Sequence, residues 1–115
     1  MKKVAKEINW NTKKNKQLIE AVLALENADE VKRFLRDLMT EGEIQEFSNR
    51  LETASLLSKD VQYNAIIKST GLSSTTIARI SKWLKGSLGG YRLILSRLNH
   101  HHNHPKLGKG LYLNS

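Results

Sequence analysis

The sequence predicts an all-α fold of about six short helices, and three observations support this prediction. Apolar residues recur at steps of three and four along most of the chain. At two places a polar residue precedes a glutamate by three positions, which is the capping-box pattern of a helix start. No segment alternates apolar and polar residues in the manner of a half-buried strand.

The N-terminal part is predicted to contain a basic arm and two helices. Residues 1–11 show no periodicity and are expected to form a flexible arm. From Thr12 onward an apolar stripe with helical spacing follows, made of Leu18, Ile19, Val22, Leu23 and Leu25. Asn27 and Glu30 form the first capping box and predict a second helix over about 28–39.

A longer helix is predicted to begin after Thr40, the cap of the second capping box, whose partner is Glu43. This helix should extend to about Ser58. Its apolar positions are Ile44, Phe47, Leu51, Ala54 and Leu57. Their spacing suits packing against another helix. This favours a homodimer, in which a helix of the second copy covers this surface.

Residues 61–85 have the pattern of a helix-turn-helix. A first helix over about 61–69 is followed by Gly71, which allows the positive φ of a tight turn. Ser73 is placed to cap a second helix. In that helix Ile77, Ile80 and Leu84 share one face and are expected to pack on Ile66 of the first helix.

The last predicted helix covers about 91–100, after the Gly89–Gly90 break. Its inward residues are predicted to be Tyr91, Ile94, Leu95 and Leu98. We therefore expect one helical domain over 12–100 and a flexible tail over 101–115 that contains histidines and lysines.

The distribution of charge is uneven along the 115 residues. Residues 1–16 carry six lysines and one glutamate, whereas residues 17–60 carry five basic and ten acidic groups. Residues 61–115 carry eight basic groups and no aspartate or glutamate. Polyanion binding is the usual reason for such a block, although a basic surface that maintains solubility is the alternative.

Composition excludes several classes of protein. Without cysteine there are neither disulfides nor cysteine metal sites. No apolar run is long enough for a membrane span, and the N-terminus lacks the apolar core of a signal peptide, so no membrane partner and a cytoplasmic location are expected. Scattered carboxylates and unpartnered hydroxyls give no catalytic constellation, and we expect no enzyme activity.

The second helix of the helix-turn-helix carries a face that suits the major groove of double-stranded DNA. Small residues at its start allow close approach, hydroxyls and a methyl group can contact base edges, and basic groups further along can reach phosphates or guanine. These residues are Ser74, Thr75, Ala78, Arg79 and Lys82. The alternatives are an ordinary helical hairpin, an RNA-binding protein, and a helical module that binds another protein.

The stretch "DLMTEGEIQEFSNRLETASLLSKD" followed by "STGLSSTTIARISKWLKG" resembles the central helices and helix-turn-helix of the tryptophan-repressor family. The resemblance covers about residues 15–98 and is closer to the relatives of unknown ligand. It implies an intertwined homodimer that binds a pseudo-palindromic operator and represses transcription. The DNA-binding residues expected from spacing and resemblance together are Asn64, Ile67, Lys68, Ser73, Ser74, Thr75, Ala78, Arg79, Lys82 and Lys85.

The resemblance also implies a candidate ligand pocket. Arg50 and Arg79 stand where the tryptophan-binding members sandwich the ligand indole, and Thr40 matches a threonine that lines the pocket. Ile80 replaces a glycine of those members, and Trp83 replaces a serine that contacts the ligand amino group. These two departures favour a regulator without cofactor that does not respond to tryptophan; a small amino-acid-like corepressor held by the two arginines is the alternative.

The segment "NHHHNHP" contains all four histidines, His100, His101, His102 and His104. Imidazoles are common ligands of divalent metals, but no nearby carboxylate or cysteine completes a set. We therefore expect no physiological metal site here.

Overall fold

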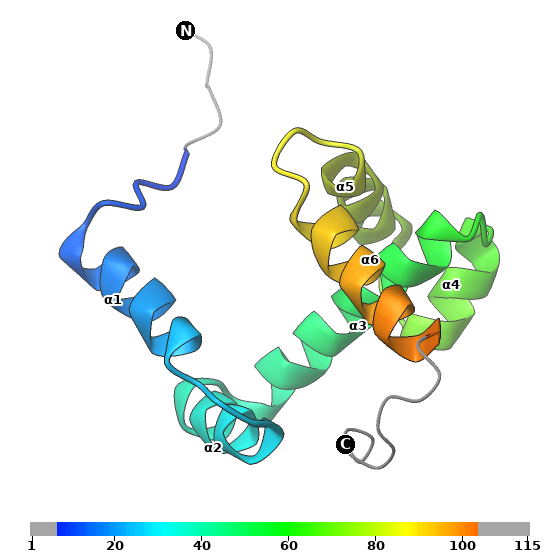
Figure 1. Cartoon of the computed structure of the whole chain (residues 1–115). Helices are drawn as coiled ribbons and strands as arrows, with labels where there is room; N and C mark the ends of the chain where they lie inside the picture. Colours follow the sequence, from blue (N-terminus) through cyan, green and yellow to red (C-terminus); the bar gives the residue numbers. More distant parts are fainter. Residues whose placement is uncertain (1–6, 104–115) are drawn as a thin grey trace, which may run out of the picture. The chain divides into compact units, whose positions relative to one another are not determined.

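The computed structural model describes residues 7–103 of the chain, and the side chains of residues 7–100. Six helices, α1 to α6, and no strand occur in this part, which confirms the predicted all-α fold (Figure 1). The chain divides into two compact units at Leu38 and Met39, with α1 and α2 in the first and α3 to α6 in the second. The prediction of one domain over 12–100 stays a prediction, and each unit is described by itself.

The first unit contains α1 (Lys13–Leu23) and α2 (Ala28–Leu38), each of which begins at a polar cap. Thr12 Oγ1 accepts a hydrogen bond from the Asn15 amide at 3.1 Å. Before α2, Asn27 Oδ1 accepts from the Glu30 amide at 3.0 Å, while the Glu30 carboxylate accepts from the Glu26 amide at 2.9 Å. The helix therefore begins at residue 28 as predicted, but the return bond to Glu30 comes from the Glu26 amide and not from the Asn27 amide that a capping box would use.

The apolar stripe predicted for α1 remains largely exposed in the single chain. Leu18 and Ile19 each retain 42% of their surface, Val22 51% and Leu23 77%. Leu25, after the helix, is half-buried. An amphipathic helix is stable in water mainly when its apolar face is covered.

The second unit begins with α3 (Glu41–Ser58), the longest helix. The predicted capping box at its start is confirmed in both directions. The Glu43 amide donates to Thr40 Oγ1 at 3.0 Å, and the Thr40 amide donates to Glu43 Oε1 at 2.9 Å. This helix packs against each of α4, α5 and α6.

The helix-turn-helix consists of α4 (Tyr63–Thr70) and α5 (Ser74–Leu84). Gly71 ends α4 with φ of +76°, a left-handed conformation in which glycine avoids the steric cost of a Cβ atom. The Gly71 amide donates to the Ile67 carbonyl at 2.8 Å. The predicted turn is therefore confirmed, although α4 begins two residues later than expected.

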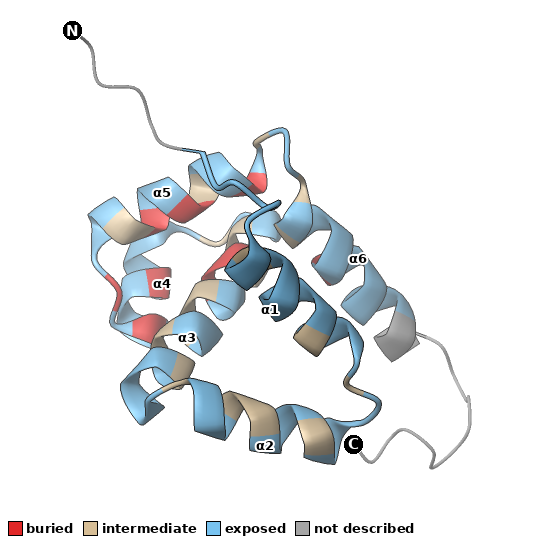
Figure 2. Cartoon of the chain, turned by 90° about the vertical axis from the view of Figure 1, so that its left-hand side faces the viewer, coloured by how far each residue is buried: buried red, intermediate tan, exposed pale blue. Residues whose placement is uncertain are grey.

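The core of the second unit lies where α3, α4, α5 and α6 face one another (Figure 2). Ile77, Ile80 and Leu84 belong to the same buried cluster as Ile66, as expected from their shared face. The complete cluster is Ala54, Ile66, Leu72, Ile77, Ile80, Leu84 and Leu95.

The last helix, α6 (Gly90–Asn103), continues three residues beyond its predicted end at 100, into the segment predicted to be a flexible tail. Leu95 is buried and Tyr91 is half-buried, as predicted. The prediction that Ile94 and Leu98 also point inward is wrong for the single chain, because they retain 40% and 43% of their surface. The other helices of the second unit do not cover the side of α6 that carries Ile94 and Leu98. Residues 1–6 of the predicted arm and 104–115 of the predicted tail lie outside the described residues.

Two buried threonines in this unit predict opposite responses to the same substitution. Thr53 Oγ1 is fully buried and has no hydrogen-bond partner among the residues that the structure describes, whereas Thr70 Oγ1 donates to the Ile66 carbonyl at 2.8 Å and accepts from the Leu72 amide at 3.2 Å. Thr53→Val should raise the free energy of unfolding by about 1 kcal/mol, because it removes an unsatisfied hydroxyl without changing shape. Thr70→Val should lower it by roughly 1–3 kcal/mol. Urea denaturation measures both, and a loss of stability in Thr53→Val would contradict the packing described.

Candidate nucleic-acid interface

The two faces of α5 differ sharply in exposure. Ile77 and Ile80 are completely buried on one face, while Ser74, Thr75 and Ala78 are exposed on the other. The cause is the 3.6-residue period, which places the apolar steps of three and four on a single side. Because the apolar face of α5 is packed in the core, its opposite face, with Ser74, Thr75 and Ala78, is exposed to solvent.

The residues predicted to bind DNA all lie on the surface of the helix-turn-helix. The exposed set comprises Asn64, Ile67, Lys68, Ser73, Ser74, Thr75, Ala78, Arg79, Lys82 and Lys85. Ile67 has 36% of its surface exposed, so an aliphatic side chain of α4 is available beside the turn. Their role in binding stays a prediction.

Ser73 has a structural task as well as a predicted contact. Its Oγ accepts from the Thr76 amide and donates to Thr76 Oγ1, each at 3.1 Å. These bonds fix the start of α5, where Ser74 and Thr75 follow directly. Ser73 is thus the N-cap that the sequence predicted, and its hydroxyl is already hydrogen-bonded in the free protein.

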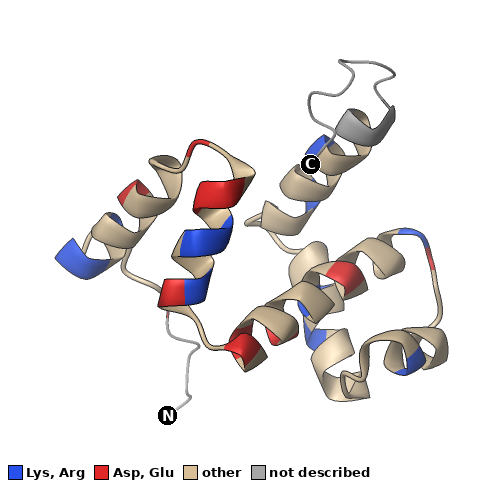
Figure 3. Cartoon of the chain, turned by 90° about the horizontal axis from the view of Figure 1, so that it is seen from below, with Lys and Arg blue, Asp and Glu red and all other residues tan. Residues whose placement is uncertain are grey.

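The electrostatic character of the described surface changes after α3. Acidic side chains occur on α1, α2 and α3 (Figure 3). The last acidic residue of the sequence, Asp60, follows α3. Residues 61–103 include lysines and arginines but no aspartate or glutamate. Such a surface attracts the phosphates of a nucleic acid at long range.

The residues predicted to form a ligand pocket have different local surroundings in the described part of the chain, and their role in a pocket stays a prediction. The Thr40 hydroxyl serves as the cap of α3. Arg50 Nε donates to Glu46 Oε2 at 3.1 Å, and its guanidinium carbon lies 5.7 Å from the centre of the Phe47 ring. Arg50 is therefore paired within its own helix, and Arg79 lies on the exposed surface of α5.

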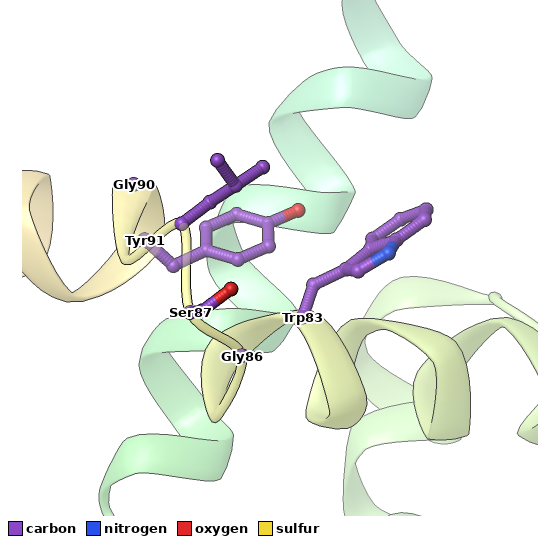
Figure 4. Close-up of a pocket in the computed structure, with 6 residues that line it drawn as sticks. Trp83, Gly86, Ser87, Gly90 and Tyr91 are labelled. Atoms are coloured by element: carbon purple, nitrogen blue, oxygen red, sulfur yellow. The ribbon is translucent and has the colours of Figure 1, made fainter. Parts of the chain in front are cut away.

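Ile80 and Trp83 occupy different environments although both depart from the tryptophan-binding pattern. Ile80 is a core residue with no exposed surface, whereas Trp83 retains 48% of its surface. The Trp83 side chain lines an open hollow of about 550 Å³ beside the turn from α5 to α6 (Figure 4). The other lining residues are Gly86, Ser87, Leu88, Gly90 and Tyr91.

Sequence reasoning missed this hollow, apart from Trp83. Tyr91 was assigned only to the core, and Leu88, which is 94% exposed, was not assigned a role. Burial raises the pKa of the Tyr91 phenol, and the positive charge of Arg50 opposes that rise. A signal in the sequence was the leucine flanked by glycines, "GSLGG", between two predicted helices.

The histidine segment is only partly described. His100 is exposed near the end of α6, while the side chains of His101 and His102 and all of His104 lie outside the described set. No cluster of three or more metal-ligating side chains occurs among the side chains that the structure describes. The expectation about metal stays a prediction. Among the described helices, none is long and apolar enough to cross a membrane.

Comparisons with known proteins agree with this geometry. The chain is 37% identical over 82 residues to the uncharacterized protein YerC of Bacillus subtilis (strain 168), a match covering 71% of this chain and 79% of YerC. The crystal structure of a TrpR-like protein from Eubacterium eligens superposes with a TM-score of 0.74 at 34% identity, covering 78% of this chain and 93% of that one. The model of the Trp repressor protein family matches residues 13–99. The helix-turn-helix, the all-α fold and these matches agree, and the chain belongs to the Trp repressor family.

Proposed function

We propose that this protein is a sequence-specific regulator of transcription that represses genes by binding double-stranded DNA. It acts in the cytoplasm as a homodimer on a pseudo-palindromic operator and has no enzyme activity. The observation that carries the proposal is the division of α5 into a buried face and an exposed face. Hydroxyls and a methyl group stand at the exposed start of the helix, and Lys82 and Lys85 follow at its end.

The assignment of contacts follows from side-chain chemistry. Ser74, Thr75 and Ala78 read base edges because they are short and lie on the exposed face near the N-terminus of α5. Lys82 and Lys85 bind phosphates, which fix orientation without reading sequence. Asn64 and Ile67 contribute from α4.

The homodimer is supported by apolar surface that one copy leaves exposed. In the first unit this surface is the stripe on α1; in the second it includes Phe47, Leu51, Ile94 and Leu98. Covering these residues with a second copy would remove a large apolar area from water. Sedimentation equilibrium should give twice the chain mass of 13.1 kDa at micromolar concentration. A monomer that still binds DNA tightly would overturn the dimer.

The decisive experiment is selection of bound sequences from random duplex DNA by the full chain. The expected product is a pseudo-palindrome, since a two-fold symmetric dimer presents two identical reading helices. Recovery of no preferred sequence would overturn the sequence-specific proposal. Equal binding to RNA and DNA duplexes would point to the RNA alternative instead.

We also propose that DNA binding does not require tryptophan. The support is local: Trp83 stands at the position of the serine that contacts the ligand, and Arg50 is paired with Glu46. Calorimetry with free tryptophan should show no binding in the micromolar range, and DNA affinity should not change when tryptophan is added. Trp83→Ser is the matched variant, because its half-exposed side chain can be replaced without emptying the core. Micromolar binding to the wild type would overturn this proposal and favour the corepressor alternative.

A further inference from the structure

Arg92 joins the C-terminal end of α5 to the first turn of α6. Its Nη1 donates to the carbonyl of Leu84 at 2.6 Å and to the carbonyl of Gly86 at 2.8 Å. Leu84 is the last residue of α5, and Gly86 follows its C-cap, Lys85. One nitrogen of a side chain on α6 therefore binds two backbone acceptors at the end of the helix proposed to read DNA.

These carbonyls are suitable partners for a cation. The last carbonyls of a helix lack donors within the helix and carry the negative end of its dipole. A guanidinium stays charged at every physiological pH and donates from several directions. Because the stretch after Asp60 contains no carboxylate, no acidic side chain of this stretch competes for Arg92.

The turn between the two helices leaves room for this side chain. Gly89 has φ of +72°, and a Cβ atom there would lie only 3.0 Å from Arg92 Nη2. Any larger residue at this position would meet backbone strain, and the guanidinium would have to shift by a few tenths of an ångström to make room for it. Three residues after Arg92, Leu95 anchors α6 in the core. The end of α5 is thus tied, through Arg92, to a helix that the core holds in place.

We propose that Arg92 is a positioning residue for DNA recognition: it holds the last turn of α5 on α6 and so fixes the exposed face of α5, without touching DNA. This inference rests on the proposed function. Lys82 lies in the turn that Arg92 holds, and Lys85 lies between its two acceptors. After release of that turn Lys82 and Lys85 can still reach phosphates of any duplex, but not while Thr75 stays aligned with its base, so the loss should fall on the operator.

The test compares Arg92→Ala and Arg92→Lys with a control, Arg97→Ala, in the full chain. Arg97 lies on the same helix, is exposed, and makes no such bond within the described residues. Hydrogen exchange of the Lys85 and Gly86 amides is the first readout, because these amides donate to Ser81 and Trp83 carbonyls in the last turn. It requires no DNA.

In Arg92→Ala these two amides should exchange roughly tenfold faster, the effect of removing a charged hydrogen bond. Arg97→Ala should leave them unchanged. Arg92→Lys should give an intermediate rate, since an ammonium restores one donor group and the charge. If Arg92→Ala does not fold, as judged by circular dichroism, the comparison of Arg92→Lys with wild type carries the same test. If the exchange rates of the Lys85 and Gly86 amides are unchanged in the folded variants, Arg92 does not hold the last turn of α5 and the proposal is overturned.

The second readout is affinity for the selected operator and for random duplex as a function of salt. Arg92→Ala should weaken operator binding roughly tenfold, with little effect on random duplex and an unchanged salt slope. A smaller slope with equal weakening on both duplexes would make Arg92 a phosphate contact and overturn the positioning role. If the wild type binds operator and random duplex equally, the proposed function fails. Faster amide exchange in Arg92→Ala would still show that Arg92 holds the last turn of α5.

Discussion

Ile66→Ala should lower the free energy of unfolding by roughly 2–5 kcal/mol, the range for removing a large aliphatic side chain from a closed core. Ile66 has no exposed surface and lies in the cluster where α4 meets α5. Its removal leaves a cavity beneath Ile77 and Ile80 and loosens the packing that holds the helix-turn-helix together. Urea denaturation monitored by circular dichroism measures the change.

The neighbouring residue provides a matched control. Ile67 is the same amino acid on the same helix, but 36% of its surface is exposed. Ile67→Ala should cost less than about 1 kcal/mol of stability, because less apolar area leaves a buried environment. Its effect should appear in DNA binding instead, since Ile67 is a proposed contact. Equal destabilisation by the two substitutions would contradict the orientation of α4.

Thr75→Ala should reduce operator affinity by roughly 1–3 kcal/mol per specific contact and relax the preference at one base position of each half-site. The exposed Thr75 hydroxyl lies near the start of α5, directly after the capped turn. Competition binding against operators with single base changes measures both effects. A uniform decrease across all duplexes would contradict the assignment of Thr75 to a base.

Lys82→Ala should behave differently, because a phosphate contact carries no sequence information. Affinity should fall for operator and random duplex alike, and the slope of log K against log salt should decrease by about one for each phosphate that the protein no longer binds. Lys59→Ala is the matched control: the residue is an exposed lysine at the C-cap of α3, outside the helix-turn-helix. A similar change of slope in both variants would point to general electrostatic attraction instead of a contact by Lys82.

Several features of the fold follow from short-range rules that a sequence displays directly. The starts of α2, α3 and α5 were predicted because Asn27, Thr40 and Ser73 form their caps with residues only three positions away. The turn before α5 was predicted because glycine at position 71 suits its positive backbone angle. Likewise, the exposed face of α5 follows from helical periodicity once its apolar face is identified.

Other features depend on contacts between helices and were missed. Ile94 and Leu98 share the spacing of Leu95, but spacing cannot tell how wide a stripe one neighbouring helix covers. The hollow beside Trp83 requires α5, the turn and Tyr91 to be placed together. Arg92 was only a positive charge in the sequence, since nothing local indicates that its side chain reaches back to Leu84 and Gly86.

The sequence by itself determined the helices, the turn and the charge block of this protein, because capping, glycine conformation and periodicity act within a few residues. Only the tertiary structure decided that Ile94 and Leu98 stay exposed beside the buried Leu95, that Trp83 lines a hollow, and that Arg92 ties α5 to α6. The physical reason is that burial and side-chain hydrogen bonds depend on the distance between helices, which no local pattern specifies.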